Sequence, residues 1–269
     1  MPTRWRFHTR SGNVVPRRAR AASRDSLRRA MLIPFNDDNP LEGITHAYVT
    51  WALIAVNVLV FVLVQHGYRA ELDIPSAFGF GAIPAVVTHA AVLPEEYVRL
   101  PAELTLVTYM FLHGGWLHLA GNMAFLWVFG DNVEDALGHA RFLLFYVLCG
   151  VAGGLAHSLA VPDSASPLVG ASAGISGLVG AYLMLHPNVR IWVLMFLRVP
   201  LRVPAIWPLG AWIVFQLWSL FQSGDEETAW WAHIAGLVAG AVLIVFLRRP
   251  GVPLWVMTRD GTPDGRPPV

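Results

Sequence analysis

Six apolar segments constrain this chain more than any other feature, because each is close to the ~20 residues that a helix needs to cross ~30 Å of hydrocarbon or, as for the short second and fifth segments, needs flanking residues to do so. They are residues 47–65, 116–130, 142–160, 168–185, 205–221 and 229–247. The sequence is 55% hydrophobic and 14% charged, which is too little charge to coat a soluble domain of 269 residues. We therefore expect an all-α, multi-pass membrane protein with six transmembrane helices that binds no nucleic acid.

The arginines predict the orientation of these segments. All nineteen basic residues are arginine, and nine of them fall within the first 29 positions. With a cytoplasmic N-terminus, six later arginines also fall on the cytoplasmic side, as the positive-inside rule requires, while the long external loop at 66–115 has only Arg69 and Arg99 against five acids. The six cytoplasmic residues are Arg141, Arg190, Arg198, Arg202, Arg248 and Arg249. The opposite side receives acidic loops at 163 and 225–227, so we expect both termini in the cytoplasm.

The chain divides into a basic cytoplasmic tail at 1–45, a membrane domain at 46–248 and a short Pro- and Gly-rich tail at 249–269, which we expect to be disordered. Arg-only, Ala-rich usage favours a bacterial inner membrane, although an Arg-rich, acid-poor leader is also typical of a mitochondrial transit segment. The loop at 66–115 is too long for a simple connection, yet its apolar pieces are too short to span. We expect it to be partly embedded in the outer leaflet, either as a brace or as a route for a substrate.

The second, fourth and sixth segments all run from the outside inward, and each carries a polar residue near its outer end. These residues are Asn122, Ser172 and His233. At 1.5 Å per residue they lie roughly 6–9 Å below the outer boundary, so an amide, a hydroxyl and an imidazole share one level. Ser172 can instead bond a carbonyl of its own helix, and Asn122 with His118, four residues apart, can be a structural pair. His233 is harder to explain structurally, because ionisable residues within membrane segments are rare.

Glycines accompany these polar residues. Two of them follow His233 at i+3 and i+7 and therefore share its helix face, while three more line the segment that holds Ser172. Small residues allow two helices to approach closely, so we expect the two segments to pack together. The glycines expected at this contact are Gly170, Gly174, Gly177, Gly236 and Gly240.

A Ser–His pair has a specific chemistry. A serine hydroxyl is a weak nucleophile until a base takes its proton, and His233 can be that base. Attack on an amide leaves a negative oxygen, for which Asn122, His118 and the backbone N–H of Ser172 are available donors. No acid lies at the same depth in the helices, since Asp131, Glu134 and Asp135 follow the second segment at its opposite, cytoplasmic end, so the pattern predicts a dyad and not a triad.

Three sequence blocks, in this order, resemble the rhomboid family of intramembrane serine proteases. They are HGGWLHLAGN at 113–122, GAS at 170–172 and AHIAGLVAG at 232–240, and the resemblance extends over about residues 47–248. It implies a six-helix rhomboid-like bundle with a long, partly embedded first external loop.

The resemblance also implies a role for each site residue. Ser172 corresponds to the family's nucleophile and His233 to its base, while His118 and Asn122 correspond to the residues that stabilise the oxyanion. The implied substrates are transmembrane segments of other membrane proteins, cut near their outer end at a small residue. The family needs no metal or cofactor, and we find no metal-binding motif in the sequence. The sequence does not predict an oligomeric state.

Two positions depart from the family pattern. Ala173 follows Ser172 where relatives commonly have glycine, and Ser176 stands where some place an aromatic ring against the histidine. The imidazole must then be held by other packing or by a hydrogen bond. A catalytically inactive relative that binds membrane clients is one alternative, although it would normally lack the serine or the histidine. A transporter or channel is another, and it predicts charged residues at mid-membrane and broken helices.

Overall fold

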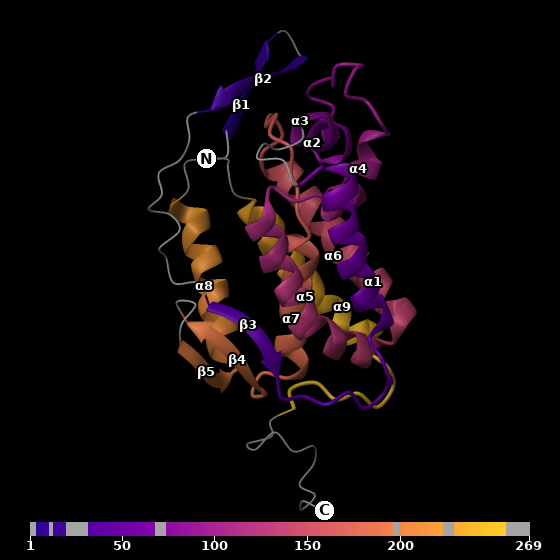
Figure 1. The fold of residues 1–269 in the computed structure, drawn as a ribbon, viewed down its shortest axis with the longest axis vertical. Helices are drawn as coiled ribbons and strands as arrows, with labels where there is room; N and C mark the ends of the chain where they lie inside the picture. The colour runs from indigo at the N-terminus through magenta and orange to yellow at the C-terminus, as the bar shows by residue number, and fades with distance from the viewer. Residues whose placement is uncertain are drawn as a thin grey trace, which may run out of the picture.

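The structure of the chain is a computed structural model that describes residues 4–10, 13–19, 32–67, 74–195, 199–222 and 229–256. Within this part the chain is mostly helical (Figure 1). Several features predicted from the sequence lie outside the described residues: Arg198, the acidic loop at 225–227 and the end of the C-terminal tail at 257–269.

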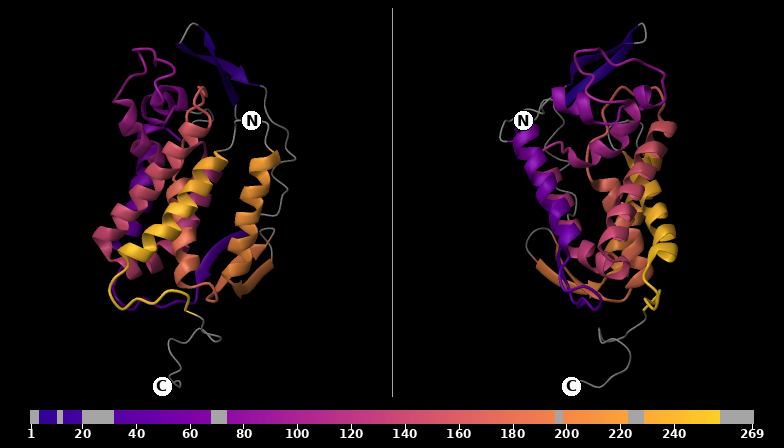
Figure 2. Two further views of the ribbon diagram at one scale, coloured as in Figure 1. Left: turned by 180° about the vertical axis from the view of Figure 1, so that it is seen from behind. Right: turned by 90° about the vertical axis from the view of Figure 1, so that its right-hand side faces the viewer.

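Long helices run side by side and form the body of the molecule (Figures 1 and 2). They are α1 (Tyr48–Leu59, continued by the π-helical stretch Val60–Val64), α5 (Trp116–Leu137), α6 (His139–Ala160), α7 (Ser172–Leu185), α8 (Ile206–Gln222) and α9 (Trp230–Leu247). Short helices fill the loop between α1 and α5: α2 (Ile74–Phe80), α3 (Pro84–Val87), α4 (Ala102–Thr108) and the 3-10 turn Tyr109–Phe111. By length and composition, α6 and α9 could each cross a membrane, whereas Tyr48–Val64, Ser172–Leu185 and Ile206–Leu220 are apolar but shorter.

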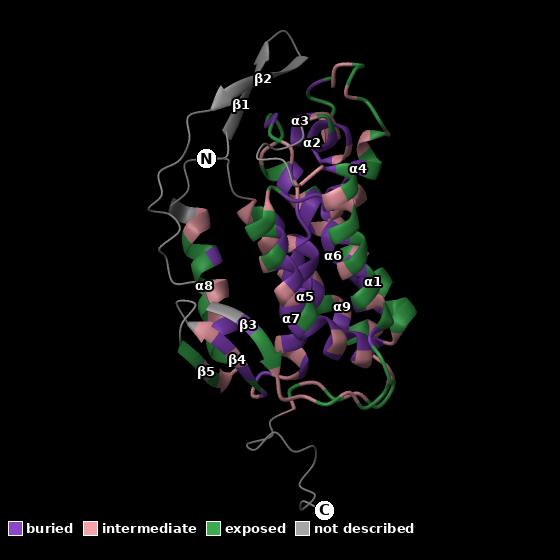
Figure 3. Ribbon diagram, viewed as in Figure 1, coloured by how far each residue is buried: buried purple, intermediate pink, exposed green. Residues whose placement is uncertain are grey.

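Helix α7 lies at the centre of the body, and its residues 173–182 are all buried (Figure 3). It packs against α5, α6 and α9. Its small residues explain this position, because glycine, alanine and serine let three neighbouring helices approach one backbone. The first residue of α7 is thereby held in a fixed place relative to α5 and α9.

The chain is mostly helical but not all-α. Strands β3 (Leu32–Asp37), β4 (Arg190–Met195) and β5 (Val199–Pro204) form an antiparallel sheet in the order β3-β4-β5, at the end of the body opposite α2 to α4 (Figure 1). A separate hairpin joins β1 (Arg4–Arg10) and β2 (Asn13–Ala19). The expectation of an all-helical chain missed the sheet, because the apolar runs of β3 and β4 are strand-sized and pair across about 160 residues.

Acidic side chains near the C-terminal end of α5 hold the start of α1 and the segment just before it. Glu134 accepts hydrogen bonds from the backbone N–H groups of Val49 and Thr50 at 3.0 and 2.8 Å and so caps α1. Asp135 accepts hydrogen bonds from the backbone N–H groups of residues 42–44 at 2.7–3.0 Å. These acids therefore serve the fold at the end of α5 remote from Ser172.

Residues 249–256 are part of the folded structure, contrary to the expectation of a disordered tail that begins at 249. The backbone N–H of Trp255 donates to the carbonyl of Met184 at 2.8 Å, and that of Arg249 donates to the carbonyl of Ala136 at 2.9 Å. These bonds satisfy carbonyls near the ends of α5 and α7, which is why this segment is ordered. Disorder stays a prediction for 257–269.

Asp37, at the end of β3, gives the fold a pH-dependent contact. Its carboxylate accepts hydrogen bonds from Asn132 Nδ2 at 2.7 Å and from the Tyr182 hydroxyl at 2.9 Å. Burial and then the charge of Asp131 raise the pKa of Asp37 to about 7. The folded state therefore binds this proton more tightly than the unfolded chain does, so the free energy of unfolding falls as the pH rises from about 4 through about 7.

Between pH 5 and pH 8, we expect the Tm of the unsubstituted protein in detergent to change in the destabilising direction by about 5 °C relative to that of Asp37→Asn. The comparison isolates this group, because an amide cannot lose a proton while the other titrating groups are the same in both proteins. Thermal unfolding followed by circular dichroism measures both values, and Asp163→Asn, at an exposed position, is the control. A pH dependence in Asp37→Asn equal to that of the unsubstituted protein would contradict this assignment.

Candidate active site

The N-terminal ends of α5, α7 and α9 bring the predicted site residues together. Ser172 is the first residue of α7, and His233 lies in the first turn of α9. His233 Nε2 is 2.8 Å from Ser172 Oγ. The segment predicted to begin at 168 becomes helical only at Ser172, because Gly170 has a φ of +127° that a right-handed helix excludes. Since α7 begins at Ser172, no earlier turn of that helix offers its hydroxyl a carbonyl.

His118, in the first turn of α5, lies close to the start of α7, where Ser172 is. The backbone N–H of Gly114 donates to His118 Nδ1 at 3.2 Å, so the neutral ring carries its proton on Nε2. A Cβ placed on Gly170 would lie 2.8 Å from His118 Nε2 and 3.6 Å from Ser172 Oγ. The missing side chain at Gly170 therefore lets the His118 ring approach the backbone just before Ser172.

Asn122 lies one turn after His118 on α5 and is only 8% exposed. Its Nδ2 is buried without a hydrogen-bond partner among the described residues. A buried donor without a partner is destabilising, and such groups in a folded protein call for an explanation. One explanation is that this amide is reserved for an acceptor that a bound molecule supplies.

Gln65 and His113 lie next to His118, and no sequence pattern predicted a role for either of them. The side chain of Gln65 donates to the His113 carbonyl at 3.0 Å and accepts from the His113 N–H at 2.8 Å. The His113 ring lies against His118 with 5.2 Å between ring centroids. Burial and then the neighbouring His118 lower the pKa of His113 to about 3, so this ring is neutral at physiological pH.

Gln216 of α8 makes a further contact in the site, which no sequence pattern predicted. Its Oε1 lies 3.2 Å from Nδ1 of His233, on the side of the ring away from Ser172. The available signal was a single amide within the apolar segment at 205–221, which is unusual for a helix expected to face lipid.

The predicted glycines divide into two groups. Gly236 and Gly240 of α9 lie directly on α7, where a Cβ on either would overlap a carbonyl oxygen of α7. Gly177 is part of the same contact. Gly174 instead faces side chains of α6 and of the 3-10 turn, and Gly170 precedes α7 and lies against His118. The close approach of α7 and α9 thus depends on Gly177, Gly236 and Gly240.

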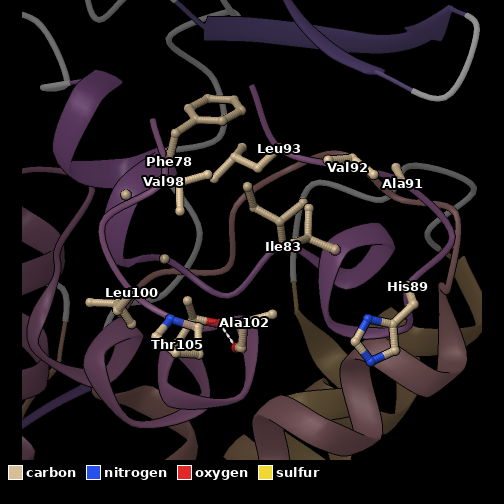
Figure 4. A pocket seen from close by; sticks show the side chains of 14 residues that line it. Phe78, Ile83, His89, Ala91, Val92, Leu93, Val98, Leu100, Ala102 and Thr105 are labelled. Atoms are coloured by element: carbon tan, nitrogen blue, oxygen red, sulfur yellow. Dashed lines mark hydrogen bonds between the residues drawn. The ribbon is translucent and has the colours of Figure 1, made fainter. Parts of the chain in front are cut away.

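A cavity of about 280 Å³ lies in the loop between α1 and α5 (Figure 4). Its lining residues all lie between Phe78 and Thr105 and are mostly apolar, with His89 as an exception. Ser172 is not among them. The loop also has a small core of its own, formed with one residue from the loop before α7. The members of this core are Phe78, Ile83, Ala85, Ala91 and Ala165. This packing favours the interpretation of the loop as a brace.

Comparison with known proteins bears on the family. Residues 101–250, more than half of the chain, match the Rhomboid domain. The chain is 31% identical to Rhomboid protease GluP of Bacillus subtilis over 192 residues. This aligned region is 71% of this chain and 33% of that protein. It is 27% identical over 204 residues to the mitochondrial Rhomboid protein 1 of Saccharomyces cerevisiae, covering 72% of this chain and 51% of that protein.

A further relative is Inactive rhomboid protein 1 of Drosophila melanogaster, which is 36% identical over 93 residues, or 34% of this chain and 6% of that protein. The chain thus spans about half or less of the length of these curated relatives. The domain match confirms the family resemblance of the three sequence blocks. The chain belongs to the rhomboid family of integral membrane proteins.

Proposed function

We propose that this chain is an intramembrane serine endopeptidase that uses Ser172 as nucleophile and His233 as base. The observation that supports this most directly is the 2.8 Å distance between Ser172 Oγ and His233 Nε2, within reach for proton transfer. The relatives include Rhomboid protease GluP and Inactive rhomboid protein 1. This chain has both the serine and the histidine of the proposed pair.

The proposed reaction follows from the positions of the donors and acceptors. Ser172 Oγ attacks the scissile carbonyl carbon while His233 Nε2 takes the hydroxyl proton. The oxyanion that forms accepts hydrogen bonds from His118 Nε2–H, Asn122 Nδ2–H and the backbone N–H of Ser172. His233 then gives its proton to the leaving amine as the C–N bond breaks. A water molecule, deprotonated by His233, hydrolyses the acyl-enzyme and restores Ser172.

The proposed substrate is a transmembrane segment of another membrane protein, cut near its outer end at a small residue. A helix hides its carbonyls in internal hydrogen bonds, so the scissile bond must be unwound before Ser172 can attack it. Segments with locally weak helicity should therefore be cleaved best.

We also propose that α1 and α5 to α9 form six membrane spans within 46–248, with the tails 1–45 and 249–269 in the cytoplasm. Helix α7 has 14 residues and is only ~21 Å long. Because its surroundings are other helices, it need not match the lipid thickness. The relatives come from a bacterium, mitochondria and chloroplasts, so they give the expected bacterial inner membrane no support.

A fluorophosphonate probe, which labels activated serines, tests the proposed function directly on the purified, detergent-solubilised protein. We expect labelling of the unsubstituted protein and none in Ser172→Ala or His233→Ala. Absence of labelling in a protein shown to be folded would favour a non-catalytic protein that binds membrane clients, with Ala173 and Ser176 as the first positions to revert to the family pattern.

Asn122→Ala should slow turnover by about 10²–10³-fold, the usual effect of removing one oxyanion donor. Cleavage of a transmembrane reporter in liposomes measures the rate. Asn57→Ala is a matched control, because Asn57 is a fully buried amide that bonds the Leu53 carbonyl within α1. We expect that variant to lose stability and to keep its turnover when folded. An unchanged rate in Asn122→Ala would remove this residue from the site.

A further inference from the structure

Gln216 is the one buried residue of α8 between positions 211 and 220 that carries a polar side chain, at 5% exposure. The helix around it is a mixture of exposed, intermediate and buried residues (Figure 3), and its sequence is mostly apolar. Its exposed members are Ile206, Trp207, Val214, Phe215, Leu217 and Trp218. Between 211 and 220 the helix thus turns a single amide inward, and Oε1 of that amide lies 3.2 Å from Nδ1 of His233.

The proton positions on His233 follow from its two contacts. A base that takes the Ser172 proton needs a lone pair on Nε2, and Nε2 is the atom that lies 2.8 Å from Ser172 Oγ. The neutral ring must then carry its proton on Nδ1. Nδ1–H is a donor, and Gln216 Oε1 is an acceptor at hydrogen-bond distance from it.

We propose that Gln216 is a positioning residue for His233: its side-chain carbonyl accepts the Nδ1 proton and so presents an unprotonated Nε2 to Ser172. This inference rests on the proposed function. Trp212 and Trp230 flank the ring at 6.4 and 6.1 Å between centroids and restrict its tilt, but neither can accept the proton.

An amide suits this position better than a carboxylate does. Among the described residues, the titratable side chains that interact with the His233 ring are His118 and His157, and neither is an acid. A buried carboxylate among apolar neighbours would need a permanent partner charge, whereas a neutral acceptor orients the ring without one. Gln216 also supplies the support that Ser176 cannot give, because the Ser176 hydroxyl donates to the Ser172 carbonyl at 2.7 Å.

The test compares Gln216→Leu, Gln216→Glu and Val214→Leu by the rate of fluorophosphonate labelling from pH 5 to pH 9. Gln216→Leu removes the acceptor at similar volume and should label about tenfold more slowly, the worth of one ordinary hydrogen bond. Gln216→Glu keeps an acceptor and should label faster than Gln216→Leu, while its ionised form pairs with the His233 imidazolium and moves the acid limb of the pH profile up by about one pH unit. Val214→Leu, on the exposed face of α8, should match the unsubstituted protein.

A purely structural role for Gln216 would lower Tm in the leucine variant without moving the acid limb in the glutamate variant, and that result would overturn the proposal. Nitrogen NMR of histidine-labelled protein gives a second readout that needs no activity. The His233 signal, assigned by its loss in His233→Ala, should report the Nδ1–H tautomer and should shift towards a mixture in Gln216→Leu. If the unsubstituted protein is folded but is not labelled by the fluorophosphonate, the proposed function is wrong. The NMR result would still decide the role of Gln216.

Discussion

Replacement of Ser172 by alanine is expected to lower peptide-bond hydrolysis by at least about 10⁴-fold, and replacement of His233 by alanine to do the same. The two side chains act in one event, since the hydroxyl attacks as the imidazole takes its proton across 2.8 Å. The double variant should therefore be no slower than either single variant. Cleavage of a liposome-reconstituted reporter with one transmembrane segment and a small residue near its outer end measures all three rates.

Ser158→Ala is the matched control for this experiment. Ser158 is a fully buried serine of α6 whose hydroxyl donates to the Gly154 carbonyl at 2.9 Å, so it represents the ordinary structural role of a membrane serine. We expect this variant to stay active. Cleavage by Ser172→Ala at the unsubstituted rate, or effects of the two single variants that multiply in the double variant, would show that Ser172 and His233 do not act together.

The sequence predicted the ends of the apolar helices well where charged residues lie just outside the helix. The segment predicted at 229–247 and α9 differ by one residue, and that at 205–221 and α8 by one residue at each end. Helix α5 instead runs seven residues past the predicted end at 130. Hydropathy places Glu134 in solvent, whereas this carboxylate is fully buried and caps α1. A buried acid with several donors looks the same in sequence as an exposed one.

The remaining differences come from contacts between distant parts of the chain. Pairing of β3 with β4 and the contact of Gln216 with His233 both depend on where whole elements dock, which no local period encodes. The start of α7 at Ser172 depends on the positive φ of Gly170, which glycine permits but does not require. The polar residues of the site could be proposed from their depth, but the orientation of each ring could not.

The contact between α7 and α9 sets the distance between Ser172 and His233. The two helix backbones are so close that no side-chain atom fits between them at the glycines. A Cβ on Gly240 would overlap the carbonyl oxygen of Gly177, and one on Gly236 would overlap that of Ala173. Both obstacles are backbone atoms of a buried helix, so no side-chain rotation can relieve them. The helices would have to separate, and Ser172 and His233 with them.

Gly240→Ala should therefore reduce the free energy of unfolding by about 3 kcal/mol. We expect a fall in Tm of about 10 °C in detergent. Gly210→Ala is the matched control: a Cβ at Gly210 of α8 meets nothing within 4 Å, so the same substitution should be neutral or slightly stabilising through helix propensity. At a temperature where both variants are folded, only Gly240→Ala should also label more slowly with the fluorophosphonate. Equal Tm values for the two variants would mean that α7 and α9 can separate freely, and the close packing could then not be what sets the distance from His233 to Ser172.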